Sequence, residues 1–130
     1  MHPGRVVLAI EDDLRNAALL RAVFATSVHD LHLTASLREA RAWLAASAAD
    51  VVLLDRHLPD GDGLTLVDEI RASPLNAGAH VVLVSASVMD SDRLAARQAG
   101  CDAFLPKPIH VRELLAEVGG ARVSRGPSAP

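Results

Sequence analysis

Residues 51–63 read VVLLDRHLPDGDG, and the fold can be inferred outward from this stretch. Its first four residues are all apolar, and the run is too short for a helix. Such a run predicts a strand buried on both faces, as in parallel sheets. The strand stops at Asp55, which places a carboxylate at its carboxyl end. Gly61 and Gly63 predict a tight turn beyond it.

The rest of the chain alternates between strand and helix patterns around this run. Residues 6–10 and 81–84 are similarly apolar, and residues 31–35 and 103–105 are weaker strands. Apolar residues recur with helical spacing in residues 14–25, 37–46, 64–72, 91–99 and 111–118. This alternation predicts an α/β fold, a doubly wound parallel sheet with right-handed crossovers and helices on both faces.

Composition limits the classes of protein that the chain can represent. Its 130 residues suit one globular domain, predicted over residues 1–118, with residues 119–130 as a flexible tail or linker. A net charge of −3 argues against direct nucleic-acid binding. The single cysteine, Cys101, excludes an intrachain disulfide, which suits a cytoplasmic protein. We expect no signal peptide and no membrane span, because no apolar run approaches the roughly 18–20 residues that a span needs.

Polar side chains gather where the predicted strands end. They are Glu11, Asp12 and Asp13 after the first strand, Asp55 after the third, Ser85 after the fourth and Lys107 after the fifth. Each has an ordinary explanation by itself, such as an acid in the first turn of a helix. Because the carboxyl ends of parallel strands share one edge of the sheet, we expect them to form one site. Close carboxylates repel one another, so the site calls for a hard divalent cation such as Mg²⁺, and one carboxylate can form an aspartyl phosphate.

Four strings of the sequence resemble the signature blocks of response regulator receiver domains, the CheY-like family of two-component signalling. They are VVLAIEDDLRNAALLRAVF, VVLLDRHLPDGDGLTLVDEIR, VVLVSAS and AGCDAFLPKPIHVRELL. The blocks occur in the family's order and at its usual spacing, up to about residue 118. The resemblance implies a flavodoxin-like sheet of five parallel strands in the order 2-1-3-4-5.

The resemblance also assigns the chemistry to particular residues. Asp55 resembles the phospho-acceptor, and Lys107 resembles the lysine that binds the phosphoryl group. The expected cofactor is Mg²⁺, with Mn²⁺ as an alternative. Its expected ligands are Glu11, Asp12, Asp55 and the backbone carbonyl of His57.

Further roles concern the switch and the lifetime of the phosphorylated form. Ser85 resembles the switch hydroxyl, and Phe104 stands at the position of the switch aromatic. The side chains of His57 and Ser87 occupy the two positions that tune dephosphorylation in the family. The peptide bond before Pro108 is expected to be cis, which aims the preceding lysine into the site.

Two further acidic residues receive no role from the resemblance. Asp13 is a third acid, which is common in the family but less often a ligand. Asp60 lies in a loop where the family often has Met or Leu.

The resemblance implies a receiver that takes a phosphoryl group from a sensor histidine kinase or a histidine phosphotransfer protein. It is not an enzyme in any other sense, because it catalyses only its own phosphorylation and dephosphorylation. Phosphorylation is expected to change the face made by the fourth helix, fifth strand and fifth helix, residues 91–118. The mixed charges of this face suit pairing with a second receiver or with a partner protein.

Two other functions compete with this interpretation. An aspartyl-nucleophile phosphatase of the haloacid-dehalogenase type also places Asp after a strand, but it needs a second Asp where this chain has His57. A pseudo-receiver would act only as an interaction module, without phosphorylation. Labelling by acetyl phosphate separates the three, since stable labelling indicates the receiver, multiple turnover the phosphatase, and neither the pseudo-receiver.

Overall fold

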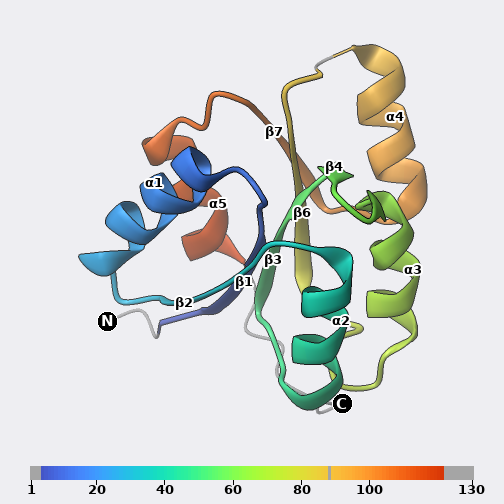
Figure 1. Cartoon of the computed structure of the whole chain (residues 1–130), viewed down its shortest axis with the longest axis horizontal. Coiled ribbons are helices and arrows are strands. Elements are labelled where there is room, and N and C mark those ends of the chain that lie inside the picture. Colours follow the sequence, from blue (N-terminus) through green and yellow to red (C-terminus); the bar gives the residue numbers. More distant parts are fainter. Residues whose placement is uncertain (1–3, 88, 122–130) are drawn as a thin grey trace.

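The five predicted strands form one parallel sheet in a computed structural model of the chain, which describes residues 4–87 and 89–121 (Figure 1). The strands are β1 (Val6–Ile10), β2 (Asp30–Thr34), β3 (Val51–Asp55), β6 (His80–Ser85) and β7 (Ala103–Pro106). Their order in the sheet is β2-β1-β3-β6-β7, and every neighbouring pair is parallel. Counting only these strands along the chain, this is the expected order 2-1-3-4-5.

A small hairpin lies outside this sheet and accounts for the remaining strand labels. It consists of β4 (His57–Leu58) and β5 (Gly61–Asp62), which pair in antiparallel fashion with His57 opposite Asp62. We predicted a turn here but not the paired strands. Pairs of two residues are too short to show the alternation of apolar and polar side chains by which a strand is recognised.

Five helices cover the two faces of the sheet. They are α1 (Leu14–Ala25), α2 (Leu37–Ala46), α3 (Leu64–Ala72), α4 (Asp90–Ala99) and α5 (Val111–Gly120). In Figure 1, α1 and α5 lie on one side of the sheet, and α2, α3 and α4 lie on the other. Each side has its own apolar core, with Leu20, Phe24 and Leu114 in one and Leu37, Leu66 and Ile70 in the other. The apolar strands are thus buried on both faces, as the sequence predicts.

The helix boundaries differ from the prediction at α4 and α5. Helix α4 begins at Asp90, one residue before its predicted start, and its N-cap is Met89. Helix α5 continues to Gly120, and Ala121 is buried in the core beside α1 and α5. The helix therefore continues two residues beyond its predicted end at residue 118. The rest of that tail, residues 122–130, lies outside the described residues.

Among residues 4–87 and 89–121, no helix is both long enough and apolar enough to cross a bilayer.

Candidate functional site

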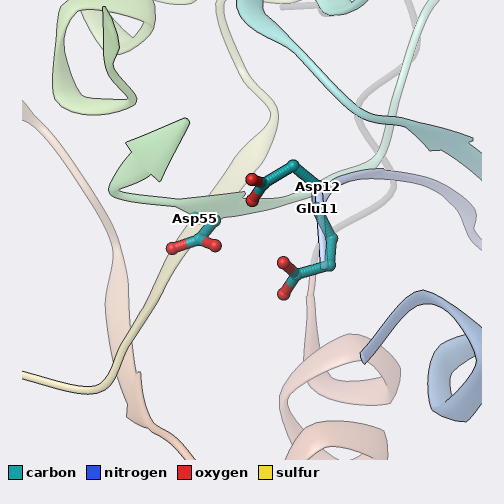
Figure 2. Close-up of side chains that lie close together, drawn as sticks. All are labelled: Glu11, Asp12 and Asp55. Atoms are coloured by element: carbon teal, nitrogen blue, oxygen red, sulfur yellow. The ribbon is translucent and has the colours of Figure 1, made fainter. Parts of the chain in front are cut away.

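Three carboxylates converge at the carboxyl edge of the sheet. Strands β1 and β3 are parallel neighbours with Ile10 opposite Leu54, so Glu11 and Asp55 come next on adjacent strands. Asp12 follows on the same side. One oxygen from each of these three acids lies within 4.8 Å of the other two, and Figure 2 shows the three carboxylates grouped together. The sheet register brings Glu11 and Asp55 together, and Asp12 joins them from the loop after β1.

Lys107 supplies the positive charge at this site. It follows β7, and the peptide bond between Lys107 and Pro108 is cis, as expected from the resemblance. Its Nζ lies 3.0 Å from Glu11 Oε1 and 3.0 Å from Asp55 Oδ2. Burial disfavours the charged lysine, but the hydrogen bonds to Asp55 and Glu11 outweigh that effect and raise the pKa of Lys107. One ammonium group is therefore shared by two of the three acids.

Burial distinguishes the acids from one another. Glu11 is 6% exposed and Asp55 is 8% exposed, whereas Asp12 is open to solvent. Burial raises the pKa of Glu11 above its ordinary value, although the N–H of Asp13 and the ammonium of Lys107 pull it down. A carboxylate that resists ionisation beside another acid is one that an additional cation would stabilise.

Asp13 does not belong to this cluster. Its Oδ1 accepts hydrogen bonds from the backbone N–H groups of Arg15 (2.9 Å) and Asn16 (3.0 Å), so it caps α1. These hydrogen bonds, mainly the one from Asn16, lower the pKa of Asp13. The sequence placed three acids after β1, and the structure separates two that face the site from one that begins a helix.

The other residues of interest surround the cluster at different depths. Ser85 is 1% exposed and directly follows Val84, which pairs with Asp55 across the sheet. His57 is exposed, and its backbone N–H lies 3.4 Å from Asp55 Oδ1. Ser87 is half-buried, and its N–H donates to Ser85 Oγ at 3.2 Å. Phe104 lies farther away on β7, half-buried under the guanidinium of Arg93.

The loop after Asp55 is held in place by close backbone packing and by hydrogen bonds to α2. Gly63 has an ordinary negative φ of −56°, and glycine is needed there because a Cβ would lie 2.1 Å from the Asp55 carbonyl oxygen. Gly61, with a φ of 147°, has the backbone expected of glycine in a turn. Asp60 accepts hydrogen bonds from the N–H groups of Leu37 (2.8 Å) and Arg38 (2.9 Å) at the start of α2. Its departure from the family's usual Met or Leu was the available signal of this role.

Comparison with known proteins identifies the family that shares this arrangement. The sequence model of the response regulator receiver domain matches residues 7–119. The chain belongs to this family. Among curated relatives, the transcriptional regulatory protein GltR of Pseudomonas aeruginosa is 30% identical over 115 residues, which make up 88% of this chain and 48% of GltR. The receiver chain thus spans about half the length of that relative.

Solved structures of receivers have the same fold. A two-component response regulator from Clostridium difficile superposes with a TM-score of 0.80 at 27% identity, over 87% of this chain and 91% of that one. The receiver domain of a sensor histidine kinase from Pseudomonas aeruginosa PAO1 gives a TM-score of 0.80 at 27% identity, over 88% of this chain and 94% of that one. That second receiver carries a magnesium ion coordinated in its active site cleft.

Proposed function

We propose that this receiver accepts a phosphoryl group on Asp55 from a sensor histidine kinase or a histidine phosphotransfer protein, and that it does so in the cytoplasm. The observation that carries the proposal is the convergence of Glu11, Asp12 and Asp55 within 4.8 Å, with Lys107 3.0 Å from Asp55. A carboxylate nucleophile with an ammonium group beside it suits phosphoryl transfer.

We propose that the acidic cluster holds Mg²⁺, with Mn²⁺ as an alternative ion. The donor set fits, because hard divalent cations prefer carboxylate and carbonyl oxygens. The proposed ligands are Glu11, Asp12, Asp55 and the backbone carbonyl of His57. A bound ion would neutralise charge on the carboxylates and on the incoming phosphoryl oxygens. The magnesium-bound receiver from Pseudomonas aeruginosa supports this choice.

The chain's own groups have distinct parts in the transfer. An oxygen of Asp55 attacks phosphorus, and the bond from phosphorus to the donor breaks as the aspartyl phosphate forms. The Lys107 ammonium, already 3.0 Å from Asp55, stabilises the charge on the phosphoryl oxygens. The Ser85 hydroxyl, beside Asp55 in the sheet register, donates to one of those oxygens. We propose that the chain catalyses only its own phosphorylation and dephosphorylation, and that His57 and Ser87 tune the second step.

The output of the switch is proposed for the face formed by α4, β7 and α5. Movement of Ser85 toward the phosphoryl group would let Phe104 swing inward, and the surface around it would then bind a partner or a second receiver. The shift from one state to the other needs only a few kcal/mol of differential stabilisation by the phosphoryl group. The chain is about half the length of GltR. The proposal therefore includes regulation of an activity that belongs to a longer protein.

Labelling with acetyl phosphate tests the proposed function. With Mg²⁺, intact-mass spectrometry is expected to show one added phosphoryl group, and the Asp55→Asn variant should show none. The matched control is Asp60→Asn, an exposed acid of the same loop, where asparagine retains hydrogen-bonding capacity and labelling should persist. Multiple turnover of small phosphoesters would instead indicate a phosphatase, and absence of any labelling would indicate a pseudo-receiver.

A further inference from the structure

A polar network joins the loop after the acceptor to the first turn of α4. Arg56, the residue after Asp55, donates from Nη1 to Asp92 Oδ1 at 3.1 Å. The other oxygen of Asp92 accepts from Ser87 Oγ at 2.5 Å. Ser87 in turn donates its backbone N–H to Ser85 Oγ at 3.2 Å. One carboxylate on α4 therefore holds the neighbour of the acceptor and the neighbour of the switch serine, and we call Arg56, Asp92 and Ser87 the α4 latch.

The ion pair in the latch is more protected from solvent than an ordinary surface pair. The side chains of Arg56 and Asp92 are 22% and 19% exposed. In the surface pair of Arg41 with Glu69 the exposed fractions are 45% and 48%. Hydrogen bonds between charged groups are among the stronger ones, and water screens them less when they are partly buried. The latch is thus able to influence the position of both segments that it joins.

A phosphoryl group on Asp55 would attract Arg56, which Asp92 holds directly, and Ser85, which contacts the backbone of the other partner of Asp92. Phosphorylation adds about −1.5 to −2 charge units next to Arg56. Ser85 must turn its hydroxyl toward the new oxygens, and its Oγ now accepts from the backbone of Ser87. The latch and the phosphoryl group therefore compete for the same cation and the same loop.

We propose that Asp92 is a positioning residue that stabilises the unphosphorylated state of this receiver by holding Arg56 and Ser87 away from the acceptor. The inference rests on the proposed function, since it concerns the regulation of the same site. A ligand that favours the active state binds more tightly when the resting state loses a stabilising contact. Breaking the latch should consequently raise the affinity for a phosphoryl mimic, whereas simple damage to the fold would lower it.

The test is a titration of the full chain with beryllofluoride in saturating Mg²⁺, followed by two-dimensional NMR. Asp92→Asn removes the charge and nearly preserves the shape, and we expect half-saturation at about fivefold lower beryllofluoride. The matched control is Asp90→Asn, which removes another acid from the first turn of α4 at an exposed position, and it should titrate like the parent. Ser87→Ala removes the hydrogen bond from Ser87 Oγ to Asp92. It should lower the beryllofluoride concentration at half-saturation by a smaller factor than Asp92→Asn does.

A double-mutant cycle with Arg56→Gln separates the latch from the general charge of the site. If Arg56 and Asp92 act as a pair, Arg56→Gln should weaken beryllofluoride binding more in the Asp92→Asn background than in the parent, where Asp92 already holds the arginine. If Asp92→Asn, Ser87→Ala and Asp90→Asn all match a parent that binds beryllofluoride, the latch is wrong and the receiver function stands. If the parent itself neither binds beryllofluoride nor is labelled by acetyl phosphate, the proposed function fails, and the latch fails with it.

Discussion

Buried polar residues lie at both ends of the sheet strands, but they have different partners at the two ends. We call the side where the strands begin the amino edge and the side where they end the carboxyl edge. At the amino edge, Asp50 is fully buried and accepts from the Val6 N–H at 2.8 Å, and Asn76 is 1% exposed and binds three backbone groups. At the carboxyl edge, Glu11 and Asp55 face each other and share one lysine. Polar groups that bind backbone hold loops in place, whereas carboxylates gathered around one cation are available to a ligand.

The largest expected effect is on stability, at the amino edge. Asn76→Ala would leave the Ala49 N–H and the carbonyls of Leu44 and Ser47 without this partner in the interior. We expect a loss of about 2–4 kcal/mol in the free energy of unfolding, measured by urea denaturation. Asp55→Asn, made in the same background without metal, should be as stable as the parent or more so, because it relieves repulsion. Equal losses in both variants would mean that the two edges do not differ in this way.

Metal binding should stabilise the carboxyl edge by a smaller amount. Mg²⁺ at about 10–100 times its dissociation constant should add roughly 1.4–2.7 kcal/mol to the free energy of unfolding. Asp12→Ala should abolish this response, which thermal unfolding with and without Mg²⁺ will measure. Asp13→Asn is the matched control, since asparagine also caps helices and Asp13 faces away from the cluster. A full Mg²⁺ response in Asp12→Ala would show that the metal binds elsewhere.

The pH dependence of stability should also differ between a site acid and a capping acid. The raised pKa of Glu11 means that, without metal, the folded state binds this proton more readily than the unfolded state. The stability that the protonated Glu11 side chain contributes is fully present below the ordinary pKa of Glu. It is lost as the pH rises through the raised pKa of Glu11. Glu11→Gln should therefore gain stability relative to the parent as the pH rises above the ordinary pKa of Glu.

Asp60 is the acid to compare with Glu11 in this measurement, because its pKa is lowered and not raised. The N–H groups of Leu37 and Arg38 lower the pKa of Asp60, so its contribution is present above the ordinary pKa of Asp and is lost as the pH falls through the lowered one. The difference between Asp60→Asn and the parent should stay flat over the same range of pH. Parallel curves for the Glu11 and Asp60 variants would contradict the distinction between the two acids.

Local sequence patterns predicted the large sheet and the acidic cluster, but not the contacts between distant residues. The sheet strands were each found to within one residue, because an apolar run that stops at a polar residue is a local signal. Glu11 and Asp55 meet because each follows the last apolar residue of its strand, and these two strands are parallel neighbours with Ile10 opposite Leu54. Asp60 caps a helix 23 residues away, and Arg56 binds Asp92 across 36 residues. No periodicity or motif identifies the partner in such a contact, since Asp60, Arg56 and Asp92 each look like a solvated charge when taken alone.

The smallest expected effect concerns how the carboxyl edge communicates with the α4 surface. The guanidinium carbon of Arg93 lies 4.8 Å from the centre of the Phe104 ring, a cation–π contact. Such contacts at exposed sites contribute about 0.5–1 kcal/mol. Arg93→Ala should therefore weaken the present position of the ring and lower the beryllofluoride needed for half-saturation by about two- to fivefold. Arg97→Ala, one turn farther along α4 and lining the same pocket as Arg93 and Phe104, should have no such effect.

Fluorine NMR can measure this effect directly, because the chain contains two phenylalanines. With fluorinated phenylalanine, Phe104 should report the switch, and Phe24, which is 4% exposed in the opposite core, should serve as the internal reference. Beryllofluoride should move the Phe104 resonance and leave that of Phe24 in place, since burial of the ring, without a hydroxyl to bond, drives the inward state. If the Phe104 resonance stays fixed while amides near Glu11 and Asp55 shift, the receiver binds phosphoryl groups without switching this face. In that outcome the comparison of edges survives, but the proposed output through α4, β7 and α5 does not.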